Sequence, residues 1–152
     1  MTIEIPSEEV IARFDQMLET FDLSREMDVL ELGRFEFRQR KKALLEFNAL
    51  FVALWKLALE KSFPDRAESI FEEFVSDLER HVPVAVKQKE ILLRAVYVYI
   101  TLLQPNLDSD FSEIGQHMVK IFRPGDEKSK AKVLKLSLRV REIFTIIFNG
   151  LI

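Results

Sequence analysis

Apolar residues recur every three or four positions along most of this chain, which is the period of an amphipathic α-helix. The first such segment follows Pro6, and Ser7 is a residue type that commonly caps the start of a helix. The pattern therefore predicts a helix that begins with Ser7 as its N-cap and ends near residue 21. Its predicted inner face consists of Val10, Phe14, Met17, Leu18 and Phe21.

The second segment is predicted to be a long helix from about residue 28 to residue 61, which ends before the Phe63-Pro64 step. Between Ala43 and Leu59 apolar residues lie on nearly all sides, as expected of a helix that other helices surround. The beginning of this segment is ambiguous. Gly33 destabilises a helix, and residues 32–38 alternate in the manner of a strand.

Three further helices are predicted. One begins at Pro64 and ends near residues 81–83, with Ile70, Phe71, Phe74, Val75 and Leu78 facing inward. Another spans about residues 84–104, and because residues 95–103 carry no charge, its second half is expected to be buried on all sides. Asp110 and Glu113 have the spacing of a capping box and predict a short helix that ends before Pro124.

The last segment, from about residue 126 to residue 149, permits two interpretations. Residues 134–141 alternate strictly between apolar and polar, which is typical of a half-buried strand, and residues 96–100 are suited to pair with them. We prefer a helix because a stable sheet needs more strands than these two segments supply.

These segments predict an all-α fold, a bundle of about six helices around a central apolar helix at about residues 40–61 and the helix at about residues 84–104. No internal repeat, low-complexity stretch or long linker separates them. We therefore expect a single helical domain over residues 1–152.

Composition narrows the classes of protein. The chain has no cysteine, which excludes disulfides, thiolate nucleophiles and cysteine-ligated metal sites. Its first residues have neither the basic start nor the apolar region of a secretory signal. The richest apolar stretch, residues 43–59, is shorter than the ~20 residues of a membrane span. We expect a cytoplasmic protein without a membrane span.

Charge is distributed unevenly, although the net charge is only −3. Residues 1–31 carry nine acids and two bases, whereas residues 120–141 carry eight bases and two acids, so the two ends are complementary. The basic segment includes a stripe that is a candidate polyanion site, formed by Lys128, Lys132, Lys135 and Arg139. Nucleic acid is not the expected partner, because the pI is about 5.5 and no nucleic-acid-binding motif is present.

The two histidines each follow a carboxylate by four residues, as Asp77 with His81 and Glu113 with His117. On helices this spacing puts each pair on one face, so four ligands for a divalent metal would converge if the two helices were neighbours. In the simpler interpretation, Asp77 and Glu113 form exposed pairs within their helices, and His81 lies near the negative end of its helix.

Two apolar features are candidates for binding. Phe47, Phe51, Trp55, Phe71, Phe74, Tyr99 and Phe144 are suited either to line a pocket for an apolar small molecule or to pack as core. Residues 143–152 contain no charge and need a cover, which is either the core itself or a second copy across a two-fold axis. The interface candidates in this tail are Ile143, Ile146, Ile147, Phe148, Leu151 and Ile152.

No nucleophile with a base, glycine-rich phosphate loop or pair of suitably spaced acids is present, so the sequence predicts no cofactor and favours a non-catalytic protein. We expect a helical interaction or regulatory module that self-associates as a homodimer through apolar helix surfaces and the tail. Two alternatives stay open. One is a sensor-like domain that binds an apolar small molecule near Trp55, and the other is a metal-binding bundle or metal-dependent enzyme that uses the four paired residues.

Overall fold

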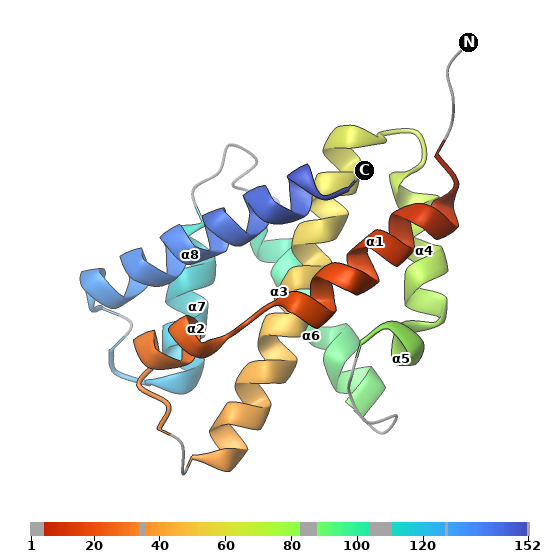
Figure 1. The fold of residues 1–152 in the computed structure, drawn as a ribbon. Helices are drawn as coiled ribbons and strands as arrows, with labels where there is room; N and C mark the ends of the chain where they lie inside the picture. Colours follow the sequence, from red (N-terminus) through yellow and green to blue (C-terminus); the bar gives the residue numbers. More distant parts are fainter. Residues whose placement is uncertain (1–4, 34–35, 83–87, 104–110, 127, 152) are drawn as a thin grey trace.

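The structure is a computed structural model that describes residues 5–33, 36–82, 88–103, 111–126 and 128–151. Within these ranges the chain forms helices and no strand (Figure 1). The all-α prediction is confirmed, and the strand alternative at residues 134–141 and 96–100 is wrong. In order, the described helices are α1 (Ser7–Thr20), α2 (Ser24–Val29), α3 (Phe37–Ser62), α4 (Ala67–Ser76), α5 (Leu78–His81), α6 (Lys89–Leu103), α7 (Ser112–Phe122) and α8 (Lys130–Asn149).

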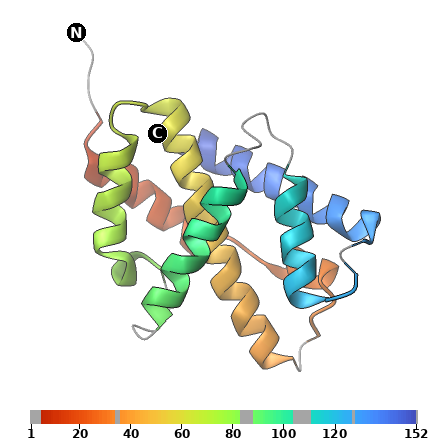
Figure 2. The same cartoon turned by 180° about the vertical axis from the view of Figure 1, so that it is seen from behind.

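The long helix α3 lies at the centre of the molecule, with α6 packed on one side and α8 on the other (Figures 1 and 2). From Phe47 to Leu59 every residue except Lys56 is buried. Even Asn48 is buried, and its side-chain amide donates a hydrogen bond to the carbonyl oxygen of Leu44 at 2.8 Å. The prediction of a central helix surrounded by others is therefore confirmed.

The remaining helices form two groups around this centre. α1 and α4 pack against each other and against α3, while α7 packs against α6 and α8 and the short α2 packs against α8. Figure 1 shows α1 and α8 on the same side of α3, and Figure 2 shows α6 and α7 on the opposite side. None of the described helices combines the length and the apolar character that a membrane crossing needs.

Several predicted helix boundaries are wrong. Ser7 is the first residue of α1 and not its N-cap, and its hydroxyl instead accepts a hydrogen bond from Arg66 at 3.2 Å. The predicted helix from Pro64 to His81 is two helices, because Asp77 departs from helical geometry between α4 and α5. α8 begins at Lys130 rather than residue 126, with Ser129 as its N-cap. Pro83 and Asp110, which were expected to mark helix ends, lie outside the described residues.

The predicted continuous helix from residue 28 is interrupted after α2 by a Schellman turn. The backbone N–H of Leu32 donates to the carbonyl oxygen of Met27 at 2.9 Å, and that of Glu31 donates to Asp28 at 3.0 Å. Glu31 occupies the left-handed conformation in this turn, with φ of 58°. Because glycine usually fills this position, a glutamate gives no sequence signal of a break.

The prediction that the second half of α6 is buried on all sides is also wrong. Tyr97 is 52% exposed and Val98 is 42% exposed, whereas Val96 and Tyr99 on the opposite side are fully buried. α6 covers α3 on one face only, so the uncharged residues between Ala95 and Leu103 include an apolar surface that faces outward.

Candidate functional site

The aromatic residues proposed to line a pocket beside Trp55 instead pack on one another. The ring of Phe14 lies parallel to that of Trp55 with centroids 4.5 Å apart, and Phe74 contacts both rings, at 5.4 and 4.9 Å. Trp55 has no exposed surface. Phe47 packs on Phe51 within α3, centroid to centroid at 6.3 Å. These rings form core around α1, α3 and α4.

The other aromatic candidates belong to different parts of the molecule. Phe71 is buried on α4 and carries the ammonium of Lys56 over its ring. Phe144 on α8 packs against Phe111 and Phe148, and Tyr99 packs against His117. None of the seven lines the three hollows whose walls the structure describes. None of these three hollows therefore lies among the aromatic rings around Trp55.

His81 does not pair with Asp77 as expected. Its Nδ1 lies 2.9 Å from both carboxylate oxygens of Asp15 on α1, and its ring stacks on Phe74. Asp77 instead accepts a hydrogen bond from Arg80 at 3.1 Å. The break between α4 and α5 explains the difference, because the i, i+4 geometry requires one continuous helix.

His117 and Glu113 lie on α7, and the imidazole of His117 meets the ring of Tyr99 edge-on at 5.4 Å. Among the described residues, no group of three or more His, Cys, Asp or Glu side chains is arranged to hold a metal ion. Since all four proposed ligands are described, the structure does not bring Asp77, His81, Glu113 and His117 together into a metal centre.

Two of the four residues of the basic stripe form ion pairs within the chain. Lys132 binds Asp126 at 2.6 Å and Glu31 at 3.3 Å, and Arg139 binds the buried Glu26. Lys128 and Lys135 are exposed. Glu26 and Glu31 come from α2 and its turn rather than from the first helix, while Asp126 precedes α8, and together these acids pair two of the four cations.

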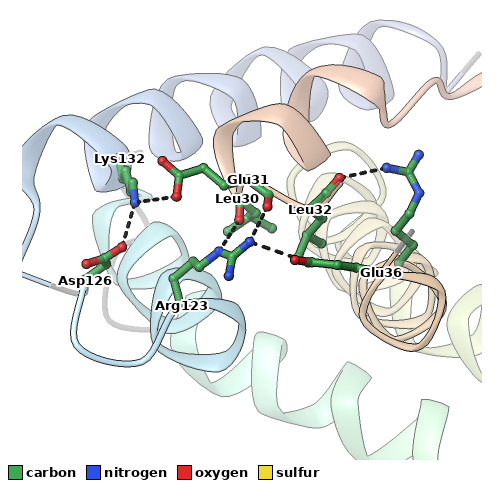
Figure 3. A network of polar contacts seen from close by, with 8 residues as sticks. Leu30, Glu31, Leu32, Glu36, Arg123, Asp126 and Lys132 are labelled. Atoms are coloured by element: carbon green, nitrogen blue, oxygen red, sulfur yellow. Dashed lines mark hydrogen bonds and ion pairs between the residues drawn. The ribbon is translucent and has the colours of Figure 1, made fainter. Parts of the chain in front are cut away.

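Figure 3 shows how this pairing holds the turn after α2 against α7 and α8. The guanidinium of Arg123 donates to the carbonyl oxygen of Leu30 at 2.8 Å and also to that of Glu31. Lys132 contacts the Glu31 side chain from the other side (Figure 3). Backbone carbonyls that a helix end leaves without partners are thereby satisfied by a cation. We assign these basic residues a structural role.

The apolar tail divides into a buried and an exposed part. Ile143, Ile147 and Leu151 are buried within this chain and are not available to a partner. Ile146 and Phe148 are 45% and 40% exposed. Ile152 lies outside the described residues. Only two of the six predicted interface residues therefore lie on a described outer surface.

The face of α8 that carries Phe148, which is not the face that carries Ile146, is exposed along most of the helix. Six exposed residues follow one another at alternating spacings of three and four, the spacing of a coiled-coil seam. Leu134 and Leu138 are 58% and 53% exposed, more than any other large apolar residue of this helix in the described part of the chain. We call this set the α8 seam, and it consists of Ala131, Leu134, Leu138, Arg141, Thr145 and Phe148.

The alternation of residues 134–141 that is typical of a strand also fits this seam. Alternate residues of a helix lie about 200° apart, so they fall on opposite faces. Leu134 and Leu138 thus face outward while Leu136 and Val140 face the core. A helix that is apolar on two faces produces the strict alternation that also suggests a strand.

A second candidate region lies where α3, α6 and α7 meet. The hydroxyl of Tyr99 donates to Oε2 of Glu46 at 2.5 Å and lies 3.3 Å from Sδ of Met118. Burial raises the pKa of the Tyr99 hydroxyl well above its usual range, and the neighbouring Glu46 carboxylate raises it further. This phenol therefore stays protonated and holds the carboxylate in place.

His117 lies beside this pair, at the junction of two hollows. Burial lowers the pKa of its imidazole, while the Glu46 carboxylate opposes this shift and Lys120 adds to it. One hollow, of about 420 Å³, is lined by Leu102, Glu113, Gln116, His117 and Lys120. The other, of about 310 Å³, is lined by Lys42, Glu46, Ile91, Arg94, Ala95, Val98, His117 and Ile121.

The chain has no significant match among protein-family models, curated proteins or solved structures.

Proposed function

We propose that this protein is a helical interaction module that self-associates by antiparallel pairing of α8. The observation that carries the proposal is the α8 seam, which presents six exposed residues at coiled-coil spacing over about 26 Å of helix. Exposed apolar surface that is contiguous along a helix is typical of a site that another protein covers. A second copy is the simplest partner because a two-fold axis pairs one surface with itself.

The order of residues in the seam favours an antiparallel arrangement. With the axis between residues 139 and 140, Ala131 faces Phe148 of the second copy, so that a small residue meets a large one. Leu134 then faces Thr145 of the second copy, and Leu138 faces the aliphatic part of Arg141. In each of these three facing pairs, a smaller or more flexible side chain of one copy meets an apolar side chain of the other.

Charges beside the seam support the same orientation. Lys135 and Glu142 are both exposed and occupy the same flanking position one heptad apart. In the antiparallel pair, Lys135 of each copy lies opposite Glu142 of the other. A parallel pair would instead place Lys135 beside Lys130 of the second copy, and the contact of two like charges is unfavourable.

Replacement of Leu134 by glutamate tests this function, because it buries a charge in the proposed contact opposite the uncharged Thr145 of the second copy. We expect the wild-type protein to be dimeric at micromolar concentrations and Leu134→Glu to raise the dissociation constant at least about tenfold. Size-exclusion chromatography with light scattering measures both species. Circular dichroism establishes that the variant stays helical.

The matched control is Leu44→Glu on α3, because Leu44 is also an exposed leucine, at 42%. This variant should remain dimeric. A wild-type protein that is monomeric throughout the micromolar range would contradict the proposal, and so would equal loss of dimer in the two variants.

A further inference from the structure

The hollow bounded by Lys42, Glu46, Arg94 and His117 lies apart from the α8 seam, and its lining combines an apolar wall with charged groups. Its lining residues belong to α3, α6 and α7, and Figure 2 shows the side of the molecule on which α6 and α7 lie. Its volume of about 310 Å³ lies at the lower end of the range for small-molecule sites. The adjoining hollow shares His117 and extends the available space.

The wall of this hollow is apolar. Ile91 and Val98 are 55% and 42% exposed, and Ala95 and Ile121 are partly exposed beside them. Residues 91, 95 and 98 follow helical spacing along one face of α6. An apolar molecule that covers this wall would remove it from water, which is favourable in proportion to the area buried.

The charged groups of the same hollow leave one excess positive charge. Lys42 and Arg94 are cationic, and no ion pair to either is found in the described part of the chain. Glu46 is the one acid in the lining, and its Oε2 is already bound by Tyr99. The adjoining hollow has one acid and one lysine, so its formal charge is balanced. An anionic group is therefore the complement that the first hollow favours.

From this combination we propose that the hollow between α3, α6 and α7 binds a small monoanionic molecule with an apolar body, such as a medium-chain carboxylate. The anionic group pairs with Lys42 and Arg94, and the apolar body covers Ile91 and Val98. This site is independent of the proposed self-association. It also differs from the predicted pocket beside Trp55, which core rings fill.

His117 supplies a direct readout because it lines both hollows. A bound anion favours the protonated imidazole and so raises its pKa. The other histidine, His81, pairs with Asp15 and lines neither hollow, so it serves as an internal reference. Glu113 and Lys120 on α7, Lys42 and Glu46 on α3, and Arg94 on α6 are the charged groups around His117.

The experiment follows the imidazole resonances of both histidines by NMR across pH, with and without decanoate. The His117→Gln variant assigns the resonances. Saturating decanoate should raise the pKa of His117 by at least about half a unit and leave His81 unchanged. The neutral probe 1-decanol should not raise it. Lys42→Gln combined with Arg94→Gln should weaken decanoate binding at least about fivefold.

Two variants on α6 separate the site from general surface effects. Val98→Glu should abolish decanoate binding, whereas Tyr97→Glu, at a neighbouring exposed position outside the hollow, should retain it. Leu134→Glu on the α8 seam should also retain it, which keeps this test separate from that of self-association. An unchanged His117 pKa, or equal losses for Val98→Glu and Tyr97→Glu, would overturn the proposal. The proposal would also be overturned if decanoate has no effect but the protein sediments together with phosphatidylglycerol vesicles. That result would assign the surface to a lipid bilayer.

Discussion

Glu26 is a charged residue with no exposed surface, and it depends on one partner from a distant part of the chain. Nε of Arg139 on α8 binds its Oε1, and Arg139 also binds Glu142 at 3.2 Å. Among the described residues, Oε2 of Glu26 has no hydrogen-bond partner. Loss of one member of such a pair leaves an uncompensated buried charge, whereas loss of both members does not.

Removal of Arg139 should therefore destabilise the protein more than removal of the whole pair. We expect Arg139→Met to lower the free energy of unfolding by about 3–5 kcal/mol, and Glu26→Leu with Arg139→Met to recover most of this loss. Urea unfolding measures all three proteins. Lys41→Met, at an exposed position on α3, is the control and should change stability by no more than about 0.5 kcal/mol. A double variant as unstable as Arg139→Met would show that the pair itself stabilises the fold.

His117 should make the stability of the protein fall in mild acid. Burial lowers the pKa of its imidazole in the folded chain, while in the unfolded chain the pKa is about 6.5. Below about pH 7 the unfolded chain binds a proton that the folded chain does not, so stability is lost as the pH decreases. The difference in unfolding free energy between wild type and His117→Gln should decrease from pH 7.5 to pH 5.5. His81 is common to both proteins and cancels. A difference that is constant with pH would contradict this role of burial.

At the level of elements, the tightest described contact of a glycine joins α7 to α8. A β-carbon at Gly115 would lie 2.6 Å from Oγ of Ser137 and 2.7 Å from the carbonyl oxygen of Val133. The hydroxyl is able to rotate away, but the carbonyl belongs to the α8 backbone. A larger residue at this position therefore requires the two helices to separate.

We predict that Gly115→Ala destabilises the protein by about 1 kcal/mol. Alanine favours the helix by about 1 kcal/mol, and the overpacking against α8 opposes this by about 1–3 kcal/mol. Gly33→Ala is the matched control, because nothing lies within 4 Å of a β-carbon there. Its melting temperature should be unchanged or slightly higher, since alanine restricts the unfolded chain. A lower melting temperature for Gly115→Ala, with an unchanged or higher one for Gly33→Ala, supports the close contact. A higher melting temperature for Gly115→Ala would refute it.

The helices themselves were predictable from periodicity, but their ends and outward faces were not. The continuous apolar character of residues 43–59 correctly placed α3 at the centre. The break at Glu31 was not predictable, because Arg123 and Lys132, some 90 residues away, hold a left-handed glutamate in place. Likewise, the uncharged half of α6 did not reveal that Tyr97 and Val98 face outward, because periodicity does not say how many neighbours a helix has.

Of the six residues that the sequence suggested as an interface, Ile146 and Phe148 are exposed, whereas Ile143, Ile147 and Leu151 are buried. The exposed Leu134 and Leu138 were missed, because their alternation with Leu136 resembled a strand. The predicted metal site, formed by two pairs of a carboxylate and a histidine, required each pair to lie on one continuous helix and the two helices to be neighbours. Contacts such as Asp15 with His81 and Tyr99 with Glu46 join residues that are far apart in the sequence, so no local spacing announces them.

At the scale of the whole molecule, the complementary charges of the two ends do meet, but through α2 rather than α1. Glu26 binds Arg139, and Glu31 binds Lys132. These two ion pairs tie α2 and the turn after it to the inner and lateral sides of α8. The opposite face of α8 carries the α8 seam, with the charged residues Lys135 and Glu142 beside it. The charge asymmetry thus serves the fold, and the outward face of α8 is available for association.

The most direct test of this account is the dissociation constant of the dimer in a charge-reversal series, measured by sedimentation velocity. Lys135→Glu and Glu142→Lys should each weaken dimerisation several-fold, because each places like charges opposite each other twice per dimer. The double variant Lys135→Glu with Glu142→Lys restores opposite charges and should return the constant to near the wild-type value. A double variant that associates no more tightly than the single variants would contradict antiparallel pairing of α8.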